Sequence, residues 1–261
     1  MITYKTPEDI AVMREGGRIL AAALQKCAAA VRPGVTLREL DTIAREYLEA
    51  QGGRPAFLGY GGSKGRPAFP ATLCVSVNDE VVHGVGTRDI ILKDGDIVGL
   101  DLGVQYPAKG GLYTDAAITV AVGKISPKAQ ELMDVTQGAL EATIAAIAPG
   151  VFIHELSKIT QEYCESRGFS VIRDLSGHGV GYKVHEDPPI LCYYESRAPR
   201  IPLKEGMVIC IEPMVSVGDW RLVTDADDWT LRTRDHSLAA HFEHTIAVTA
   251  GGHEVLTLAE G

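Results

Sequence analysis

The chain has 261 residues, enough for one large domain or two small ones, and its shares of hydrophobic (46%) and charged (23%) residues are typical of a globular protein. The net charge of −9 argues against nucleic acid as a main ligand, because binding nucleic acid usually requires a basic face. No apolar run reaches the roughly 18 residues of a membrane span and no signal peptide is visible, so we expect a cytoplasmic protein that does not bind membranes.

The first half of the chain predicts two helices followed by strands. Residues 6–9 (TPED) are typical of a helix start, with a capping hydroxyl, then proline and two acidic residues in the first turn. Apolar residues at helical spacing predict a second helix over about residues 36–50. Strands are expected at residues 73–77, 97–104 and 113–122.

The second half begins with another helix start, at Ser126 and Pro127. Helices are expected over about 127–147 and 153–167, and strands near 169–173, 181–185, 207–212 and 242–249. Five scattered cysteines without a CxxC pair predict neither a disulfide framework nor a thiolate zinc site. Of these, Cys74 and Cys210 are expected to be buried packing residues.

The two halves of the chain resemble each other. Residues 92–101 (LKDGDIVGLD) align with 203–212 (LKEGMVICIE), and 33–40 (PGVTLREL) align with 149–156 (PGVFIHEL). The first pair of segments consists of a glycine turn, an apolar strand and one final carboxylate. The period is too long for a solenoid, so a duplicated α/β half is the better interpretation. We expect a single domain, 1–261, with halves of about 1–124 and 125–261.

Each half supplies two carboxylates at apolar strands, Asp101 with Asp115 and Glu212 with Glu243. An acid of this kind taken alone is more often solvated or caps a turn. Four that lie together would repel one another and raise at least one pKa strongly unless a cation lies between them. Their hard oxygen atoms suit Mg, Mn, Fe, Co or Zn.

Histidines accompany these acids. His83 and His178 stand beside glycines, which allow close backbone approach, and His185 follows seven residues after His178. A lone histidine is more often structural, but three beside four acids favour a metal or catalytic site. His244 should point to the opposite face from Glu243 and is expected to be an ordinary histidine. Residues 59–65 are rich in glycine but lack the order of a phosphate-binding loop.

Together these motifs resemble one family over nearly the whole chain. They are Asp101, Asp115 and the segments 78–84 (NDEVVHG), 177–181 (GHGVG), 185–186 (HE), 212–214 (EPM) and 242–245 (FEHT). The ordered set of two aspartates, one histidine and two glutamates is similar to that of the pita-bread metallopeptidases, and the flanking residues are similar to those of type I methionine aminopeptidases. The resemblance implies an α+β pita-bread fold, with pseudo-twofold-related halves and antiparallel sheet covered by helices.

The resemblance also implies an activity and its residues. Such an enzyme removes the N-terminal methionine of nascent polypeptides when the second residue is small, and it uses two divalent ions (Co, Mn, Fe, Zn or Mg). The implied metal ligands are Asp101, Asp115, His178, Glu212 and Glu243, with Asp115 and Glu243 bridging. The implied catalytic residues are His83, His185 and Glu212. The implied substrate pocket consists of Tyr60, Phe69, Cys74, His83, Val184 and Trp229. The expected partners are nascent N-termini at the ribosome, and the expected state is a monomer.

Three features depart from the family's usual pattern. Val184 stands where the family often has phenylalanine, and the loops over 61–70 and 102–114 are longer. Two alternatives stay open: another pita-bread aminopeptidase or prolidase-like dipeptidase, and a non-catalytic binding homologue. The second would have lost metal ligands, whereas all five are present in this chain.

Overall fold

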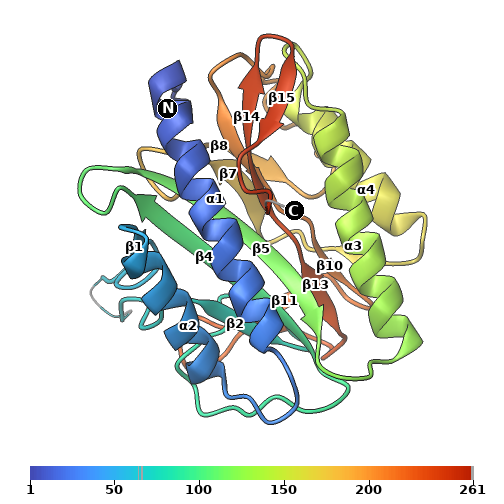
Figure 1. Cartoon of the computed structure of the whole chain (residues 1–261). Coiled ribbons are helices and arrows are strands. Elements are labelled where there is room, and N and C mark those ends of the chain that lie inside the picture. The colour runs from blue at the N-terminus through green and yellow to red at the C-terminus, as the bar shows by residue number, and fades with distance from the viewer. Residues whose placement is uncertain (64, 66, 260–261) are drawn as a thin grey trace.

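The computed structural model describes residues 1–63, 65 and 67–259 of the chain. Within them, four helices accompany strands that pair antiparallel (Figure 1). The helices are α1 (Pro7–Ala30), α2 (Leu37–Ala50), α3 (Pro127–Ala145) and α4 (Ile153–Glu165). The strands of the first half are β1 (Arg54–Pro55), β2 (Cys74–Val77), β3 (Glu80–Val82), β4 (Ile97–Tyr106) and β5 (Leu112–Ala121). Those of the second half are β6 (Ser170–Val171), β7 (Ser176–Gly179), β8 (Glu186–Leu191), β9 (Val208–Ile211), β10 (Met214–Ser216), β11 (Leu222–Thr224), β12 (Leu231–Thr233), β13 (Ala239–His241), β14 (His244–Thr249) and β15 (Gly252–Val255).

The helix starts follow from local side-chain chemistry. Thr6 accepts a hydrogen bond from the backbone of Asp9, and the Asp9 carboxylate accepts one from the backbone of Thr6. Thr36 and Glu39 make the same reciprocal pair at the start of α2. Each pair satisfies backbone N–H groups that the helix leaves free, and a good N-cap contributes about 1 kcal/mol. The predicted start at residues 6–9 is confirmed.

Helices α1 and α2 cover the sheet of the first half. That sheet has the order β1-β4-β2, and β5 pairs with β4 along its full length. Both helices lie in front of it in Figure 1. Leu20, Leu24 and Leu40 of the helices pack with Leu100 and Leu102 of β4 in one buried core. The apolar alternation along β4 therefore turns one face towards the helices and leaves the other for the interior of the molecule.

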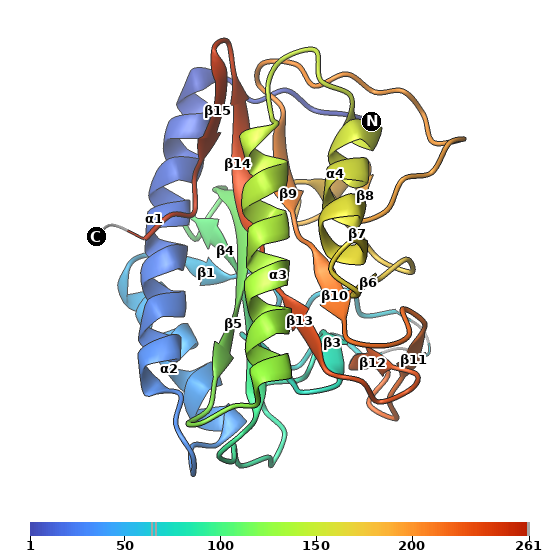
Figure 2. The same cartoon turned by 90° about the vertical axis from the view of Figure 1, so that its right-hand side faces the viewer.

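The second half repeats this arrangement with a second core. Its five-stranded sheet has the order β15-β14-β9-β7-β8, and α3 and α4 pack against each other beside the strands (Figure 2). Two three-stranded sheets, β13-β10-β6 and β11-β12-β3, complete the fold. Leu132, Leu156, Ile209, Ile211 and Ile246 are buried in the core of this half. The boundary expected near residues 124–125 falls in the turn between β5 and α3.

Some expected elements differ from the observed ones. The strand predicted near 181–185 is wrong, because residues 181–185 form bends and β8 begins only at Glu186. The backbone of Gly181 has a φ of 142°, which a strand pattern does not anticipate. Lys64 and Arg66, within the loop 61–70 noted as long, lie outside the described residues. In the described part of the chain, none of the helices has the length and hydropathy needed to cross a membrane.

Candidate metal centre

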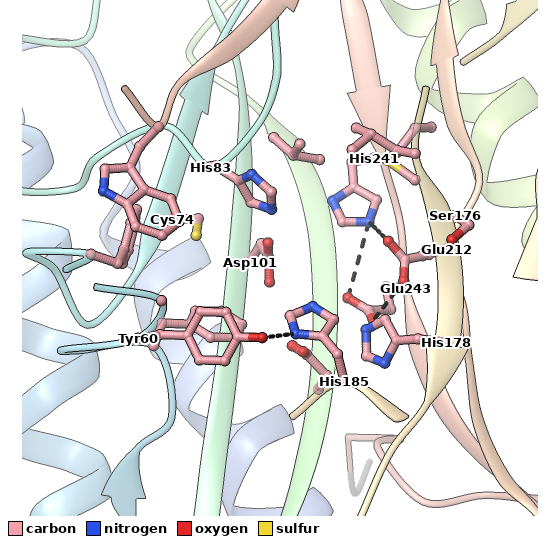
Figure 3. Close-up of a pocket in the computed structure, with 18 of the residues that line it drawn as sticks. Tyr60, Cys74, His83, Asp101, Ser176, His178, His185, Glu212, His241 and Glu243 are labelled. Atoms are coloured by element: carbon pink, nitrogen blue, oxygen red, sulfur yellow. Dashed lines mark hydrogen bonds and ion pairs between the residues drawn. The ribbon is translucent and has the colours of Figure 1, made fainter. Parts of the chain in front are cut away.

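A cavity of about 350 Å³ lies where the strands of the two halves meet (Figure 3). Its wall includes acidic and histidine side chains from both halves of the chain. Four aromatic residues also line it: Phe57, Tyr60, Phe69 and Trp229. The carboxylates that line it are Asp101, Asp115, Asp174, Glu212 and Glu243, and the histidines are His83, His178, His185 and His241. The cavity is therefore both highly charged and partly apolar.

The first two carboxylates share one face of the β4–β5 ladder. Asp101 pairs with Ala117 and Gly103 pairs with Asp115, so the two acids lie diagonally across adjacent strands. Side chains two residues apart on a strand point to the same face, which brings both carboxylates into the cavity. Ligand atoms of Asp101, Asp115 and Glu243 all lie within 4.8 Å of one another. The strands predicted at residues 97–104 and 113–122 thus supply two of the three acids in this cluster.

The second half supplies the remaining ligand atoms. Glu212 follows β9 directly and Glu243 precedes β14, which pairs with β9. His178 lies on β7, and its Nε2 is 3.4 Å from Oε1 of Glu212. A side chain on Gly177 would overlap the carbonyl of Cys210, so glycine permits β7 to approach β9 this closely.

Cys210 also lies close to the cluster. Ligand atoms of His178, Cys210 and Glu243 lie within 4.8 Å of one another. Burial, with Glu243 and Asp115 nearby, raises the pKa of the Cys210 thiol well above its usual value. A protonated thiol is a poor metal ligand. The expected packing role of Cys210 is compatible with this environment.

Burial and mutual repulsion raise the pKa of these acids. Burial raises the pKa of Asp101 to about 7. Burial, and then the neighbouring carboxylates, raise the pKa of Asp115, Glu212 and Glu243 well above their usual values. In the described part of the chain, one buried oxygen of each of these four carboxylates has no hydrogen-bond partner. Unpaired buried oxygens that face one another are costly without a cation, so the donor set fits divalent metal ions.

His178 suits the role of a nitrogen ligand. Burial, together with the nearby His185, lowers its pKa to about 3, so the imidazole is neutral at physiological pH. Its Nδ1 lies 2.9 Å from the carbonyl of Gly179 and donates a proton to it, which leaves the Nε2 lone pair directed towards Glu212. A backbone partner on the other ring nitrogen is the usual way in which proteins orient metal-binding histidines.

The other end of the cavity is mostly aromatic. Phe69 and Trp229 form an edge-to-face pair with ring centroids 5.2 Å apart, and the ring of His83 lies 6.4 Å from that of Trp229. At the mouth, the hydroxyl of Tyr60 lies 2.6 Å from Nδ1 of His185 (Figure 3). These contacts give the cavity an apolar wall directly beside the carboxylates.

The structure places most of the expected pocket residues in this wall. Tyr60, Phe69, Cys74, His83 and Trp229 line the cavity. Cys74 pairs with Asp101 across β2 and β4, so this cysteine borders the acid cluster as well as packing in the interior. Val184 is buried in the cluster of Phe57, Phe69 and Trp229, behind the lining residues. The ring of His244 forms a hydrogen bond with the Thr257 hydroxyl and is not among the residues that line the cavity. This position is compatible with the expected role of a histidine outside the site.

His241 is a site residue that the sequence reasoning did not identify. It ends β13, and its Nε2 lies 3.8 Å from Oε2 of Glu212 and 4.0 Å from Oε2 of Glu243. Burial, with His83 and His178 nearby, lowers its pKa to about 3. The available signal was its position two residues before Glu243, although His241 lies just outside the strand expected over 242–249. Asp174, Leu175 and Ser176 also line the cavity and were not predicted from the sequence.

The sequence matches the model of metallopeptidase family M24 over residues 11–250. The chain belongs to this family. A methionine aminopeptidase from Aquifex aeolicus is 43% identical over 257 residues, which cover 98% of each chain. Methionine aminopeptidase 1 from Bacillus subtilis is 43% identical over 259 residues, 98% of this chain and 99% of that one. The resemblance to methionine aminopeptidases is confirmed, and the chain is a metallopeptidase.

Solved structures agree with this assignment. The crystal structure of a methionine aminopeptidase from Thermotoga maritima superposes with a TM-score of 0.93 at 44% identity, and the match covers 100% of both chains. A prolidase from Pyrococcus furiosus has a TM-score of 0.75 at 25% identity, and the match covers 99% of this chain but 66% of the prolidase. The expected pita-bread fold is thus confirmed, and the prolidase contains an additional third that this chain does not match.

Proposed function

We propose that this metallopeptidase removes the N-terminal methionine from polypeptides whose second residue is small, and that it does so with two divalent ions. The observation that carries the proposal is that ligand atoms of Asp101, Asp115 and Glu243 lie within 4.8 Å of one another, in a cavity where Nε2 of His178 also lies 3.4 Å from Glu212. All five of these side chains line the cavity, beside its apolar wall. The names of the similar proteins support the choice of methionine.

Five side chains would hold the two ions. Asp101 would chelate one ion, and His178 and Glu212 would complete the coordination of the other. Asp115 and Glu243 would contribute to both sets, and ligand atoms of Glu243 lie within 4.8 Å of those of Asp101 and Asp115 and also of His178. When bound, divalent ions would supply polarisation of the scissile carbonyl and a lower pKa for the attacking water. The unpaired oxygens of the four carboxylates support this assignment.

The apolar end of the cavity would receive the methionine side chain. Phe69 and Trp229 present ring edges and faces, and sulfur interacts favourably with aromatic rings at about 5 Å. Tyr60 and Cys74 complete this wall next to the acids. A substrate whose side chain enters here would place its free amine and its first peptide bond over the carboxylate cluster, which favours cleavage of the first residue only.

Two histidines would act on the substrate. In Figure 3, Asp101 lies between His83 and His185. We assign them to hold the substrate amide and to stabilise the negative charge that develops on its oxygen. Glu212 would accept the proton of the attacking water and pass it to the leaving nitrogen. The raised pKa of Glu212, caused first by burial, is compatible with this transfer.

The proposed substrate also implies a cellular setting. Nascent polypeptides at the ribosome are the natural source of N-terminal methionine, so we propose them as substrates, with the cytoplasm as the compartment. We also propose that the enzyme acts as a monomer, because the acids and histidines of the cavity come from a single chain.

The test combines metal analysis with substrate choice. Protein purified without added metal is analysed for bound ions and then titrated with Co, Mn, Fe, Zn and Mg, using Met-Ala-Ser as substrate. We expect activity to require divalent ions, and saturation at two ions per chain. Met-Leu-Ser and N-acetyl-Met-Ala-Ser should be poor substrates, because the second residue is large or the amine is blocked.

Other results would favour the alternatives. Faster cleavage of dipeptides that end in proline would indicate a prolidase-like enzyme. Absence of peptidase activity with all five metals, despite bound ions, would indicate a binding homologue. Full activity with a single bound ion would contradict the dinuclear mechanism but leave the substrate assignment intact.

A further inference from the structure

A buried ion pair joins the N-terminal segment to the residue that follows His185. Nζ of Lys5 lies 2.7 Å from Oε2 of Glu186, and the two side chains are 1% and 4% exposed. The hydroxyl of Thr3 contacts the same carboxylate, and Lys5 also donates to Thr3. Charged side chains are rarely buried this completely unless they are paired. The pair lies outside the set of groups that line the cavity.

The loop before His185 is folded around this ion pair. A side chain on Gly181 would overlap the Cε atom of Lys5, so the loop passes directly over the lysine stem. The backbone N–H of Lys183 donates to the other carboxylate oxygen, Oε1 of Glu186, at 2.8 Å. The N–H of Gly181 donates to the carbonyl of Lys183 at 3.1 Å. Residues 181–186 therefore pack around the Lys5–Glu186 pair and share hydrogen bonds with it.

The same segment is anchored to the rest of the centre. The N–H of Lys5 donates to the carbonyl of Gly206 at 2.7 Å, immediately before the strand that leads to Glu212. The carbonyl of Gly181 accepts a bond from the N–H of Tyr113 at 2.7 Å, on the strand that carries Asp115. The loop of His185 is thus held from both halves.

His185 needs such support because its own side chain is exposed. It lies at the mouth of the cavity, where its ring centroid is 4.3 Å from that of His178 and its Nδ1 contacts Tyr60. Burying two charges is costly, and apolar replacements of a buried ion pair are often equally stable. An ion pair with defined hydrogen bonds, however, allows one geometry, whereas apolar contacts allow several. The effect of the pair should therefore be on geometry more than on stability.

We propose that Lys5, acting through Glu186, is a positioning residue that holds His185 over the metal centre. The N-terminal segment then helps to determine the geometry of the active site. This inference rests on the proposed function, in which His185 acts on the substrate. A displacement of about 1 Å in a catalytic group can cost on the order of 100-fold in rate, so small shifts of this loop matter.

The test is a double-mutant cycle between Lys5 and His185. Lys5→Met retains most of the apolar stem but removes the charge. We expect kcat to fall by roughly 10- to 100-fold, with KM and bound metal nearly unchanged. In a His185→Ala background, assayed at high enzyme concentration, Lys5→Met should cause no further fall in kcat. An equal fold-loss in both backgrounds would show a general structural effect and overturn the inference.

Two further variants keep the test decisive if Lys5→Met folds poorly. Lys5→Met combined with Glu186→Leu leaves no unpaired buried charge, so it should melt close to the wild type. Its kcat should nevertheless stay low, and wild-type turnover in this variant would overturn the inference. Arg14→Met is the matched control, since it removes an exposed ion pair to Glu254 from the same end of the chain and should leave kcat unchanged.

The turnover of the His185→Ala variant distinguishes a failure of the proposed function from a failure of the inference about Lys5. If His185→Ala itself retains wild-type turnover, the role of His185 is wrong, and the positioning role of Lys5 falls with it. If His185→Ala is inactive while Lys5→Met and the double replacement are fully active, the proposed function stands and only the inference about Lys5 is wrong.

Discussion

Ala117 and Glu243 exchange two backbone hydrogen bonds across the boundary between the halves. The N–H of Ala117 donates to the carbonyl of Glu243 at 3.3 Å, and the N–H of Glu243 donates to the carbonyl of Ala117 at 2.8 Å. Asp115 stands two residues before Ala117, on the same face of β5. This bridge therefore brings a carboxylate from one half beside a carboxylate from the other.

The shared position of Asp115 and Glu243 leads to the first prediction. Asp115→Ala removes a ligand that would contact both ions, so we expect loss of at least one bound ion per chain. Turnover should fall by more than about 100-fold, because replacing even an outer partner of a ligand typically costs 10- to 100-fold. Elemental analysis and steady-state kinetics measure both effects. An Asp115→Ala protein with full metal content and normal turnover would exclude the dinuclear assignment.

The two neighbouring histidines should respond differently to replacement. His178→Ala should lower metal occupancy, since its neutral Nε2 faces Glu212. His185→Ala should keep its metal content but lose roughly 100-fold or more in kcat, the usual cost of removing one group that stabilises the charge of the transition state. Metal analysis of both variants beside their kcat values checks this. Loss of metal in His185→Ala would show that the two roles are misassigned.

Val184 should influence selectivity indirectly. It packs against the ring cluster of Phe69 and Trp229, so Val184→Phe should push that wall inward and narrow the cavity. A methylene-scale change in an apolar pocket is worth roughly 1–3 kcal/mol of discrimination, and we expect kcat/KM for methionine over leucine to rise about tenfold. The melting temperature shows whether the added bulk is tolerated. An unchanged or lower ratio in a folded variant would mean that this position does not determine the pocket width.

Metal-free enzyme should lose stability as pH rises. The folded state raises the pKa of Asp101 from 3.8 to about 7, so it holds a proton that the unfolded chain releases. The resulting stabilisation is complete below about pH 4 and is lost as pH rises through about 7. Asp115, Glu212 and Glu243, whose pKa values are also raised, act in the same direction.

Thermal unfolding of chelator-treated protein between pH 5 and 8 tests this dependence. Each proton released contributes a slope of roughly 1.4 kcal/mol per pH unit. Asp101→Asn should flatten the curve, and added divalent ions should restore the wild-type melting temperature most strongly at the highest pH. The electrostatic account of the cluster would be contradicted if the melting temperature of the metal-free wild-type protein rose over this pH range relative to that of metal-free Asp101→Asn.

The sequence by itself determined the local elements. The caps at Thr6 and Thr36, the paired strands of Asp101 and Asp115, and the glycines around His178 depend on neighbouring residues, and short-range patterns report them directly. The resemblance to a known family then predicted the pita-bread fold, which the comparisons confirmed. A helix cap or a strand period is a property of a few adjacent residues, so it can be recognised without knowledge of the rest of the chain.

Only the tertiary structure decided which distant groups meet. Ala117 contacts Glu243, His241 faces Glu212, and Lys5 is buried against Glu186, although 181 residues separate the last two. Residues 181–185, which pass over the Lys5 side chain, form bends where the sequence had predicted a strand. Such pairings are selected by packing and electrostatics summed over the whole chain, and these long-range energies override local preference where the two compete.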